Sequence, residues 1–318
     1  MITLQFCYLM AGLAFGSYAV LSAFDRSNRK RFGNAAFWGL FASSFLFGSY
    51  LTDWQNGLLV LALILLGGCG LVGHGKPSTT SSKERRESAI LRGNWLFAPA
   101  LLVPAVALLG TLFLKQAQIG GSALLDPKNV TVISLVLGVV IALGVAMLWL
   151  RSKPPAPLQE GRRLADMIGW AIILPQLLAS LGAIFALSGV GKAVGEIATR
   201  YLPLGQPFEA VLVYCVGMAA FTAVMGNAFA AFPVMTAGIG LPLIVHQFHG
   251  NAAIMAAIGM LSGFCGTLTT PMAANFNIVP AALLELPDRN GVIKVQLPTA
   301  GLMLIANTLL MYALVYRF

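Results

Sequence analysis

The chain carries little charge. Only 10% of its 318 residues are Asp, Glu, Lys or Arg, whereas 58% are hydrophobic and the mean hydropathy is +0.82. Soluble domains contain about 25% charged residues, so this composition excludes an ordinary soluble domain. Long apolar runs recur along the sequence, and they predict a multi-pass protein of the lipid bilayer.

The sequence also lacks the common signatures of enzymes and of metal sites. It contains no His-Glu-x-x-His, Gly-x-Ser-x-Gly or Walker sequence and no Cys-x-x-Cys pair. The four cysteines lie far apart in or beside apolar runs, which is typical of small buried side chains. His246 and His249 are one helical turn apart but have no third ligand. We therefore expect no catalytic residues, no metal site and no cofactor.

The net charge of +9 does not indicate a nucleic-acid partner, because the basic residues lie in short loops between apolar runs. Alternate loops, at 25–31, 74–94 and 151–163, hold four, five and four Lys or Arg residues, and the intervening loops hold none and two. Basic loops stay on the cytoplasmic side of a membrane. The count therefore predicts that the N-terminus lies outside.

The pattern of apolar runs predicts two membrane domains joined by a linker. Residues 1–150 contain uninterrupted runs and are expected to form scaffold-like transmembrane helices. Residues 151–167 are rich in Pro and basic residues and are expected to be a cytoplasmic linker. Residues 168–318 are interrupted repeatedly by Pro, Gly and Asn, which predicts a transport-like domain with broken helices.

Two polar, helix-breaking stretches stand out in this second part. Residues 226–233 and 263–280 each contain an Asn beside a break, a nearby aromatic residue and a Pro. In hydrocarbon, irregular backbone is tolerated only where protein buries it or where it lines a watery cavity. Two interrupted segments are the sequence signal of a transporter site near the membrane midplane. We therefore expect an all-α transmembrane bundle with discontinuous helices or re-entrant hairpins.

The chemistry of these stretches suits a small anion and a cation. Half-helix N-termini carry a positive partial charge that suits a carboxylate, while Asn, Thr and freed carbonyl oxygens suit Na⁺. No carboxylate lies in either stretch, and this favours Na⁺ over proton coupling. Asp166, Glu209 and Glu285 are expected near span ends, close to water, with Glu209 or Glu285 as the reserve proton relay.

The alternative is that the small residues of these stretches serve only close helix packing. Gly191-x-x-x-Gly195 and Gly259-x-x-x-Gly263 are compatible with such contacts. Packing needs small residues but not amides, so the paired asparagines favour a binding site.

Residues 263–280, together with 226–233 and 174–182, resemble an uncharacterised family of bacterial inner-membrane proteins. The resemblance covers nearly the whole chain, and the run Gly-Thr-Leu-Thr-Thr-Pro-Met-Ala-Ala-Asn-Phe-Asn at 266–277 is its most specific part. The broken segments are also distantly similar to the ion-transporter superfamily of carboxylate and gluconate carriers. This similarity implies an elevator-type secondary transporter that moves a small organic anion past a fixed scaffold.

The resemblance also implies partners and a substrate. The family is often encoded beside a second, smaller membrane protein and a peptidase that releases pyroglutamate, which makes 5-oxoproline a candidate beside dicarboxylates. Full carriers of the superfamily contain two inverted repeats. In this chain, one alternative is that residues 175–195 form the first hairpin in a compressed form. The other, which we prefer, is that a second subunit or another copy in a homo-oligomer supplies the missing repeat. The other functional classes are a non-transporting assembly subunit and, with least support, a membrane-embedded enzyme.

The candidate residues follow from the broken stretches and from the resemblance. The expected substrate-binding residues are Asn227, Thr267, Thr269, Thr270, Asn275 and Asn277. The expected cation-binding residues are Gly226, Gly266 and Asn275. The expected hinges or helix breaks are Pro175, Pro233, Pro271 and Pro280.

Overall fold

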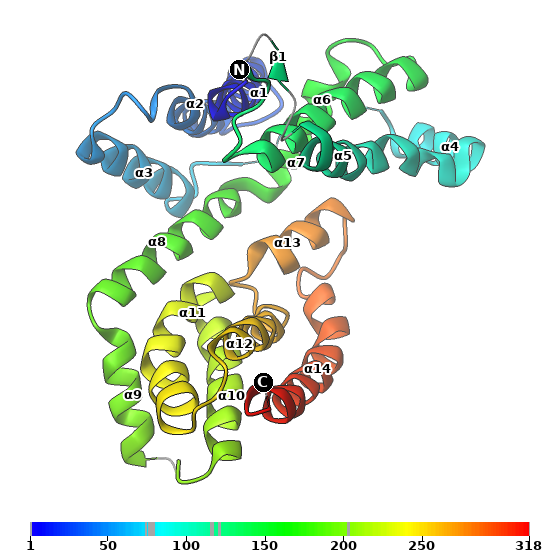
Figure 1. Cartoon of the computed structure of the whole chain (residues 1–318). Coiled ribbons are helices and arrows are strands. Elements are labelled where there is room, and N and C mark those ends of the chain that lie inside the picture. The colour runs from blue at the N-terminus through cyan, green and yellow to red at the C-terminus, as the bar shows by residue number, and fades with distance from the viewer. Residues whose placement is uncertain are drawn as a thin grey trace. The chain divides into compact units, whose positions relative to one another are not determined.

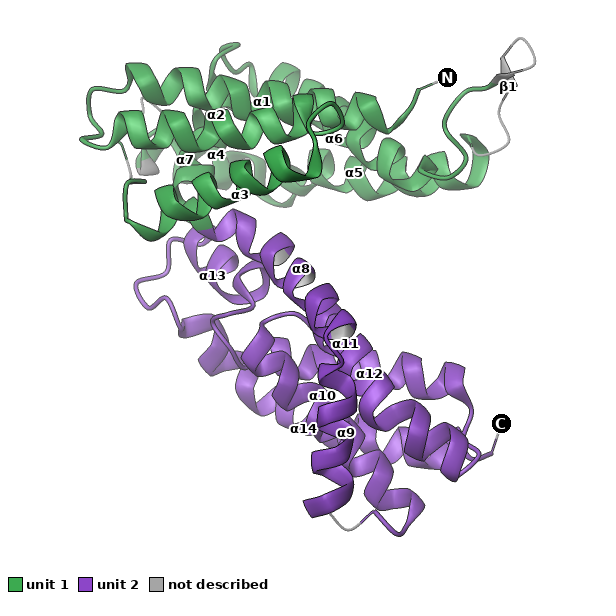
Figure 2. Cartoon of the chain, turned by 90° about the vertical axis from the view of Figure 1, so that its left-hand side faces the viewer, with its two compact units in different colours: residues 1–170 green, residues 171–318 purple. Residues whose placement is uncertain are grey.

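The computed structural model describes residues 2–73, 75, 80–114, 118–119, 122–201 and 204–317. Apart from two strands of two residues each, the elements formed by these residues are helices. Among the described residues, seven helices are long and apolar enough to cross a membrane, by length and composition. The all-α, multi-pass helical bundle expected from the sequence is confirmed. The chain divides into two compact units, residues 1–170 and residues 171–318 (Figure 2).

Unit 1 contains two pairs of packed helices, α1 with α2 and α5 with α6, and α7 packs against α1. In chain order its elements are α1 (Leu4–Phe24), α2 (Arg31–Phe47), α3 (Asp53–Gly68), α4 (Ser82–Arg92), the 3-10 turn η1 (Gly93–Leu96), α5 (Phe97–Leu109), the π turn η2 (Gly110–Leu114), β1 (Gln118–Ile119), β2 (Ser122–Ala123), α6 (Val130–Leu150) and α7 (Ala156–Ile168) (Figure 1). A second 3-10 turn, η3 (Gly169–Ile173), follows α7.

Aromatic side chains form the core between α1 and α2. Phe15 stacks on Trp38 with ring centroids 5.7 Å apart and meets Phe41 edge-on at 4.6 Å. Trp38 and its neighbour Phe37 are fully buried. Such ring pairs stabilise a core by about 0.5–1.5 kcal/mol beyond the burial of their area. The α1–α2 pair is therefore a rigid base for the polar contacts beside it.

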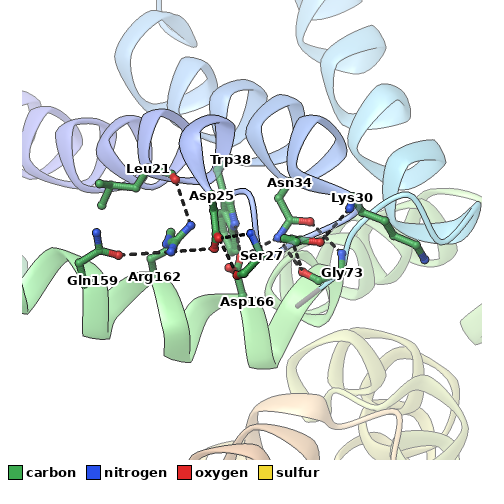
Figure 3. A network of polar contacts seen from close by, with 11 residues as sticks. Leu21, Asp25, Ser27, Lys30, Asn34, Trp38, Gly73, Gln159, Arg162 and Asp166 are labelled. Atoms are coloured by element: carbon green, nitrogen blue, oxygen red, sulfur yellow. Dashed lines mark hydrogen bonds and ion pairs between the residues drawn. The ribbon is translucent and has the colours of Figure 1, made fainter. Parts of the chain in front are cut away.

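Helix α7 occupies most of the segment that the sequence suggests is a linker, and it brings two charged side chains inside unit 1 (Figure 3). The Asp166 carboxylate accepts hydrogen bonds from Asn34 Nδ2 at 2.9 Å and Trp38 Nε1 at 2.8 Å. The Arg162 guanidinium lies 3.0 Å from Asp25. Arg162 is 3% exposed and Asp166 is 4% exposed. The expectation that Asp166 lies close to water is therefore wrong.

Arg162 and Asp166 are both buried because their four-residue spacing places them on one face of α7, the face that packs inside unit 1. Burial of an unpaired charge is very costly, so such a face is stable only against matching polar partners. Those partners come from the loop after α1 and from the start of α2, which lie more than 120 residues earlier in the chain. Helix α7 is thus an integral part of unit 1.

The three basic segments of unit 1 meet at one end of that unit. Asn28 donates a hydrogen bond to the Gly73 carbonyl at 3.3 Å, and Thr80 Oγ1 donates to Glu160 of α7 at 3.2 Å. The contact of Arg162 with Asp25 joins α7 to the loop after α1. This arrangement agrees with the expectation that the basic loops share one side of a membrane. Which side this end faces stays a prediction.

Unit 2 is built around α10, which packs against α12, α14 and the α11 segment. Its elements are α8 (Leu174–Leu187), α9 (Val190–Tyr201), α10 (Pro207–Met225), α11 (Ala228–Met235), the π-helix η4 (Thr236–Gln247), α12 (Ala252–Thr267), α13 (Ala274–Leu283) and α14 (Gly291–Val315). The fully buried side chains of its core include Tyr214, Met218, Met255 and Met311.

Helices α8 and α9 run alongside α11 and η4 in the same direction. A Cβ added at Gly182 of α8 would lie 2.6 Å from Ala230 of α11, and a Cβ at Gly195 of α9 would press on the backbone of Gly238 in η4. Residue numbers rise together on both sides of this contact, so the two segments are parallel. A hairpin would reverse direction between 175 and 195. The alternative in which residues 175–195 form a compressed hairpin is therefore wrong.

The four prolines expected at helix breaks occupy three different environments. Pro271 lies between α12 and α13, as expected for a discontinuous helix. Pro175 lies in the first turn of α8, directly after the 3-10 turn η3, and Pro is common at such a position. Pro233 and Pro280 lie inside α11 and α13, and the helix that contains Pro233 continues in the π form from Thr236. At these two positions the structure differs from the expected break.

Candidate functional site

The first polar stretch forms the turn of a helical hairpin. Helices α10 and α11–η4 are antiparallel, and Tyr214 OH lies 3.1 Å from Thr236 Oγ1 across them. Gly226 has a φ of +72°, where a side chain is strained, and a Cβ on it would lie 2.6 Å from the Met272 backbone. Asn227 then caps α11, because its Oδ1 accepts from the Phe229 N–H at 2.9 Å. The turn at 226–227 therefore lies against the connection between α12 and α13.

The second polar stretch is that connection, and one buried amide holds it. Asn277 is fully buried, and its Nδ2 donates to the Thr267 carbonyl at 2.8 Å and to the Thr270 carbonyl at 2.6 Å. These two bonds fold the start of α13 back onto the end of α12. They satisfy carbonyl groups that a broken helix would otherwise leave unpaired in an apolar setting.

The threonine hydroxyls of this stretch are used locally. Thr267 Oγ1 donates to the Phe264 carbonyl at 2.6 Å, and Thr269 Oγ1 donates to the Gly266 carbonyl at 2.8 Å. Thr270 Oγ1 accepts from the Met272 N–H at 3.2 Å. Such side-chain to backbone bonds are the usual way in which Thr shapes a turn.

The two polar stretches converge on one cavity of about 200 Å³. It is lined by the turn before α11, by the first turn of α13 and by residues of α8 and α12, namely Leu178, Gly226, Asn227, Ala228, Phe229, Phe264, Met272, Ala274, Asn275 and Phe276. Phe264 contacts Phe229 and Phe276, with ring centroids 5.9 and 6.2 Å away. The cavity therefore has an apolar wall and two amides.

Two helix N-termini line this cavity. The first amides of an α-helix lack intrahelical acceptors and carry about half a positive charge. In α11 the Asn227 side chain caps one of them, whereas α13 has no side-chain cap. No charged side chain is among the described residues that line the cavity. The helix ends are therefore its main source of electrostatic potential, and that potential favours an anion.

A family model matches residues 5–316 of the chain. The chain belongs to the family described as protein of unknown function (DUF979). This confirms the resemblance of nearly the whole sequence to one uncharacterised family. No curated protein matches the chain, and no solved structure matches it.

In this DUF979 member, the cavity brings together three of the residues expected at the site. They are Gly226, Asn227 and Asn275. The other expected residues, Thr267, Thr269, Thr270, Asn277 and Gly266, are not among its lining residues. A Cβ on Gly266 would press on the Ala219 backbone of α10, so this glycine permits close packing of α12 on α10.

Seven of the described lining residues were not among the site residues expected for this DUF979 member, and of these only Leu178 lies outside the two polar stretches. Phe264 lies one helical turn before Thr267, and that spacing indicates that the two side chains share a face of α12. Leu178 is an apolar residue in an apolar helix, so nothing in the sequence distinguishes it from its neighbours. Only the packing of α8 against α11 places it at the cavity.

Proposed function

We propose that this chain is a secondary active transporter, or the transporting subunit of one, for a small organic anion. The observation that carries the proposal is the convergence of two helix N-termini, at Ala228 and Ala274, on one cavity. Its volume of about 200 Å³ is below the roughly 300–1,000 Å³ of drug-sized pockets, which suits a small molecule. A carboxylate at the helix ends and an apolar body against Phe229 and Phe276 would fit 5-oxoproline or a small dicarboxylate.

We further propose that transport is coupled to Na⁺. Proton-coupled carriers usually keep a carboxylate or His inside the membrane. The described lining residues include neither, and they offer instead the amide oxygens of Asn227 and Asn275. Glu209, the reserve relay, lies in the capping box at the start of α10, and Glu285 is exposed after α13. Neutral oxygen donors suit a small hard cation.

The proposed mechanism is of the elevator type in the bacterial inner membrane. The cavity lies entirely within unit 2, which would carry the substrate, while unit 1 would serve as the scaffold. Because residues 175–195 do not form a hairpin, the second half of the machinery would come from a smaller membrane protein or from a second copy of this chain. The assignment of these two roles is based on the division of the chain into two compact units.

The test is uptake of labelled 5-oxoproline and dicarboxylates into proteoliposomes under an imposed Na⁺ gradient, with and without the smaller membrane protein. We expect Asn275→Ala to reduce uptake at least tenfold, because the variant lacks the amide at the uncapped start of α13. Asn290→Ala is the matched control: Asn290 is exposed, lies before α14, and is not among the described cavity-lining residues.

Equal uptake by Asn275→Ala and by Asn290→Ala would contradict the assignment of the site. Absence of uptake of every anion tested, with or without the second protein, would favour the alternative of a non-transporting assembly subunit.

A further inference from the structure

Unit 1 contains a second and larger cavity, of about 850 Å³, at the end where its basic segments meet. It lies between α4, the C-terminal end of α6 and the start of α7. In Figure 1, α4 is followed through η1 by α5. Among the described residues that line this cavity, four are basic, namely Arg85, Arg92, Arg151 and Lys153.

The acidic residues that line the cavity are already engaged. Glu84 accepts the Ser81 N–H at 2.7 Å in the capping box that starts α4. Glu160 pairs with Arg163 at 2.6 Å, and Arg163 is not among the lining residues. Arg151 and Lys153 form no ion pair with a described residue. The cavity therefore presents a net positive charge.

The α6 side of the same cavity, its floor, is apolar, and an apolar groove shares Arg92 with the cavity. Leu143, Ala146 and Met147 of α6 line it together with the basic residues. An adjoining cavity of about 500 Å³ shares Arg92 and runs over α5 and α6 between two tryptophans. The Arg92 guanidinium lies 5.9 Å from the ring of Trp149, and Trp95 is 75% exposed.

This succession of a basic cavity, tryptophans and an apolar groove matches the layers of a membrane surface. Tryptophan concentrates at the headgroup level, and basic pockets between transmembrane helices bind acidic headgroups. A soluble phosphate would use the basic residues and leave the groove empty. A phospholipid would use both.

We propose that these two cavities form a binding site for one anionic phospholipid. Its phosphate lies among Arg92, Arg151 and Lys153, and an acyl chain lies along the groove between Trp95 and Trp149. The bound lipid neutralises basic residues of α4 and of the segment after α6, and it connects these two parts of unit 1. The site is separate from the anion cavity of unit 2, so it stands whether or not the chain is a transporter.

The test is native mass spectrometry of the purified full-length protein with phosphatidylglycerol and with phosphatidylcholine. We expect the parent protein to retain phosphatidylglycerol selectively. Arg92→Gln combined with Arg151→Gln should weaken that binding roughly tenfold or more, because each basic residue near a membrane surface contributes about a fivefold factor. The matched control is Arg26→Gln with Arg29→Gln, which removes the same charge from exposed positions outside both cavities.

A second variant separates the site from overall charge. Ala146→Phe fills the floor of the cavity without changing any charge, so it should also release the lipid. The corresponding pair of Arg→Lys substitutions should retain most of the binding. Equal loss in the Arg26 and Arg29 control, or full retention in Ala146→Phe, would overturn the proposal. Displacement of the lipid by millimolar inorganic phosphate would also overturn it in favour of a soluble phosphate ligand.

Discussion

At the scale of single residues, the ionisation of Asp25 contributes to the stability of unit 1. Burial acts to raise the pKa of its carboxyl, but hydrogen bonds from Ser27 and the charge of Arg162 outweigh burial and hold this pKa below its ordinary value of 3.8. A carboxyl with a lowered pKa in the folded state stabilises the fold above its unfolded pKa. That stabilisation is lost as the pH falls through the folded pKa.

We therefore predict that unit 1 loses stability as the pH falls below about 4, the unfolded pKa of an Asp. The Asp25→Asn variant should be less stable than the parent at neutral pH and should show a flatter pH dependence. Melting temperature in detergent between pH 3 and pH 6 measures this. Asp53→Asn, at an exposed position in the first turn of α3, serves as the control. Parallel curves for the parent and Asp25→Asn would contradict the role of the ion pair.

Side chains whose position follows from local sequence could be predicted, and those defined by distant partners could not. Asn227 and Asn275 line the cavity, as expected for amides beside helix breaks in apolar stretches, and their role in binding stays a prediction. In sequence, Thr267 and Thr269 look like candidates for ligand binding as much as the asparagines do. In the structure, their hydroxyls bond to carbonyls three residues earlier. Nothing in a sequence distinguishes a hydroxyl that bonds to its own backbone from one that faces a ligand.

At the scale of helices, the parallel contact of α9 with η4 depends on glycine. A Cβ on Gly238 would press on the Gly191 carbonyl oxygen, and the two backbones approach too closely for a side chain. Small residues permit such approach in membranes, where dispersion contacts replace the hydrophobic effect between helices. The Gly191-x-x-x-Gly195 pattern is therefore a packing motif, as its spacing indicates.

We predict that Gly238→Val destabilises unit 2 by about 1–3 kcal/mol, the usual cost of overpacking. Gly301→Val is the matched control, because it introduces the same side chain into a helix of the same unit where nothing lies within 4 Å of the added Cβ. Thermal unfolding in detergent should separate the two variants. If both lower the melting temperature equally, the effect belongs to Val in a helix and not to the α9–η4 contact.

The helices differ in how far the sequence could define them. Apolar runs predicted the long helices, because length and hydropathy suffice for a membrane span. The segment that contains α7 looks like a linker in sequence, since Pro and basic residues cluster between residues 151 and 163. The four-residue spacing of Arg162 and Asp166 was a usable signal of a buried face. The continuity of α11 through Pro233 could not be predicted, because Pro in an apolar run ordinarily indicates a kink or the end of a helix.

At the scale of the whole molecule, the proposed function predicts which gradient drives uptake. Replacing Na⁺ by choline should reduce uptake of the anion at least tenfold, whereas a protonophore should leave uptake unchanged at constant membrane potential. Measurements with this chain alone and with the smaller membrane protein would show whether one chain suffices. Uptake that follows a pH gradient without Na⁺ would contradict the proposed coupling and would direct attention to Glu209 and Glu285.

The contacts of α7 also determine when unit 1 can be completed during synthesis. Asn34 and Asp166 are 132 residues apart, and Arg162 follows Asp25 after a similar interval. At roughly 5–20 residues per second, the ribosome needs on the order of ten seconds to make that length of chain. Throughout this time, the loop after α1 and the start of α2 lack the partners that α7 provides. The polar contacts at the end of α1 are therefore completed only after α7 is made, and a chain interrupted before α7 would leave Asp25 without its Arg162 partner.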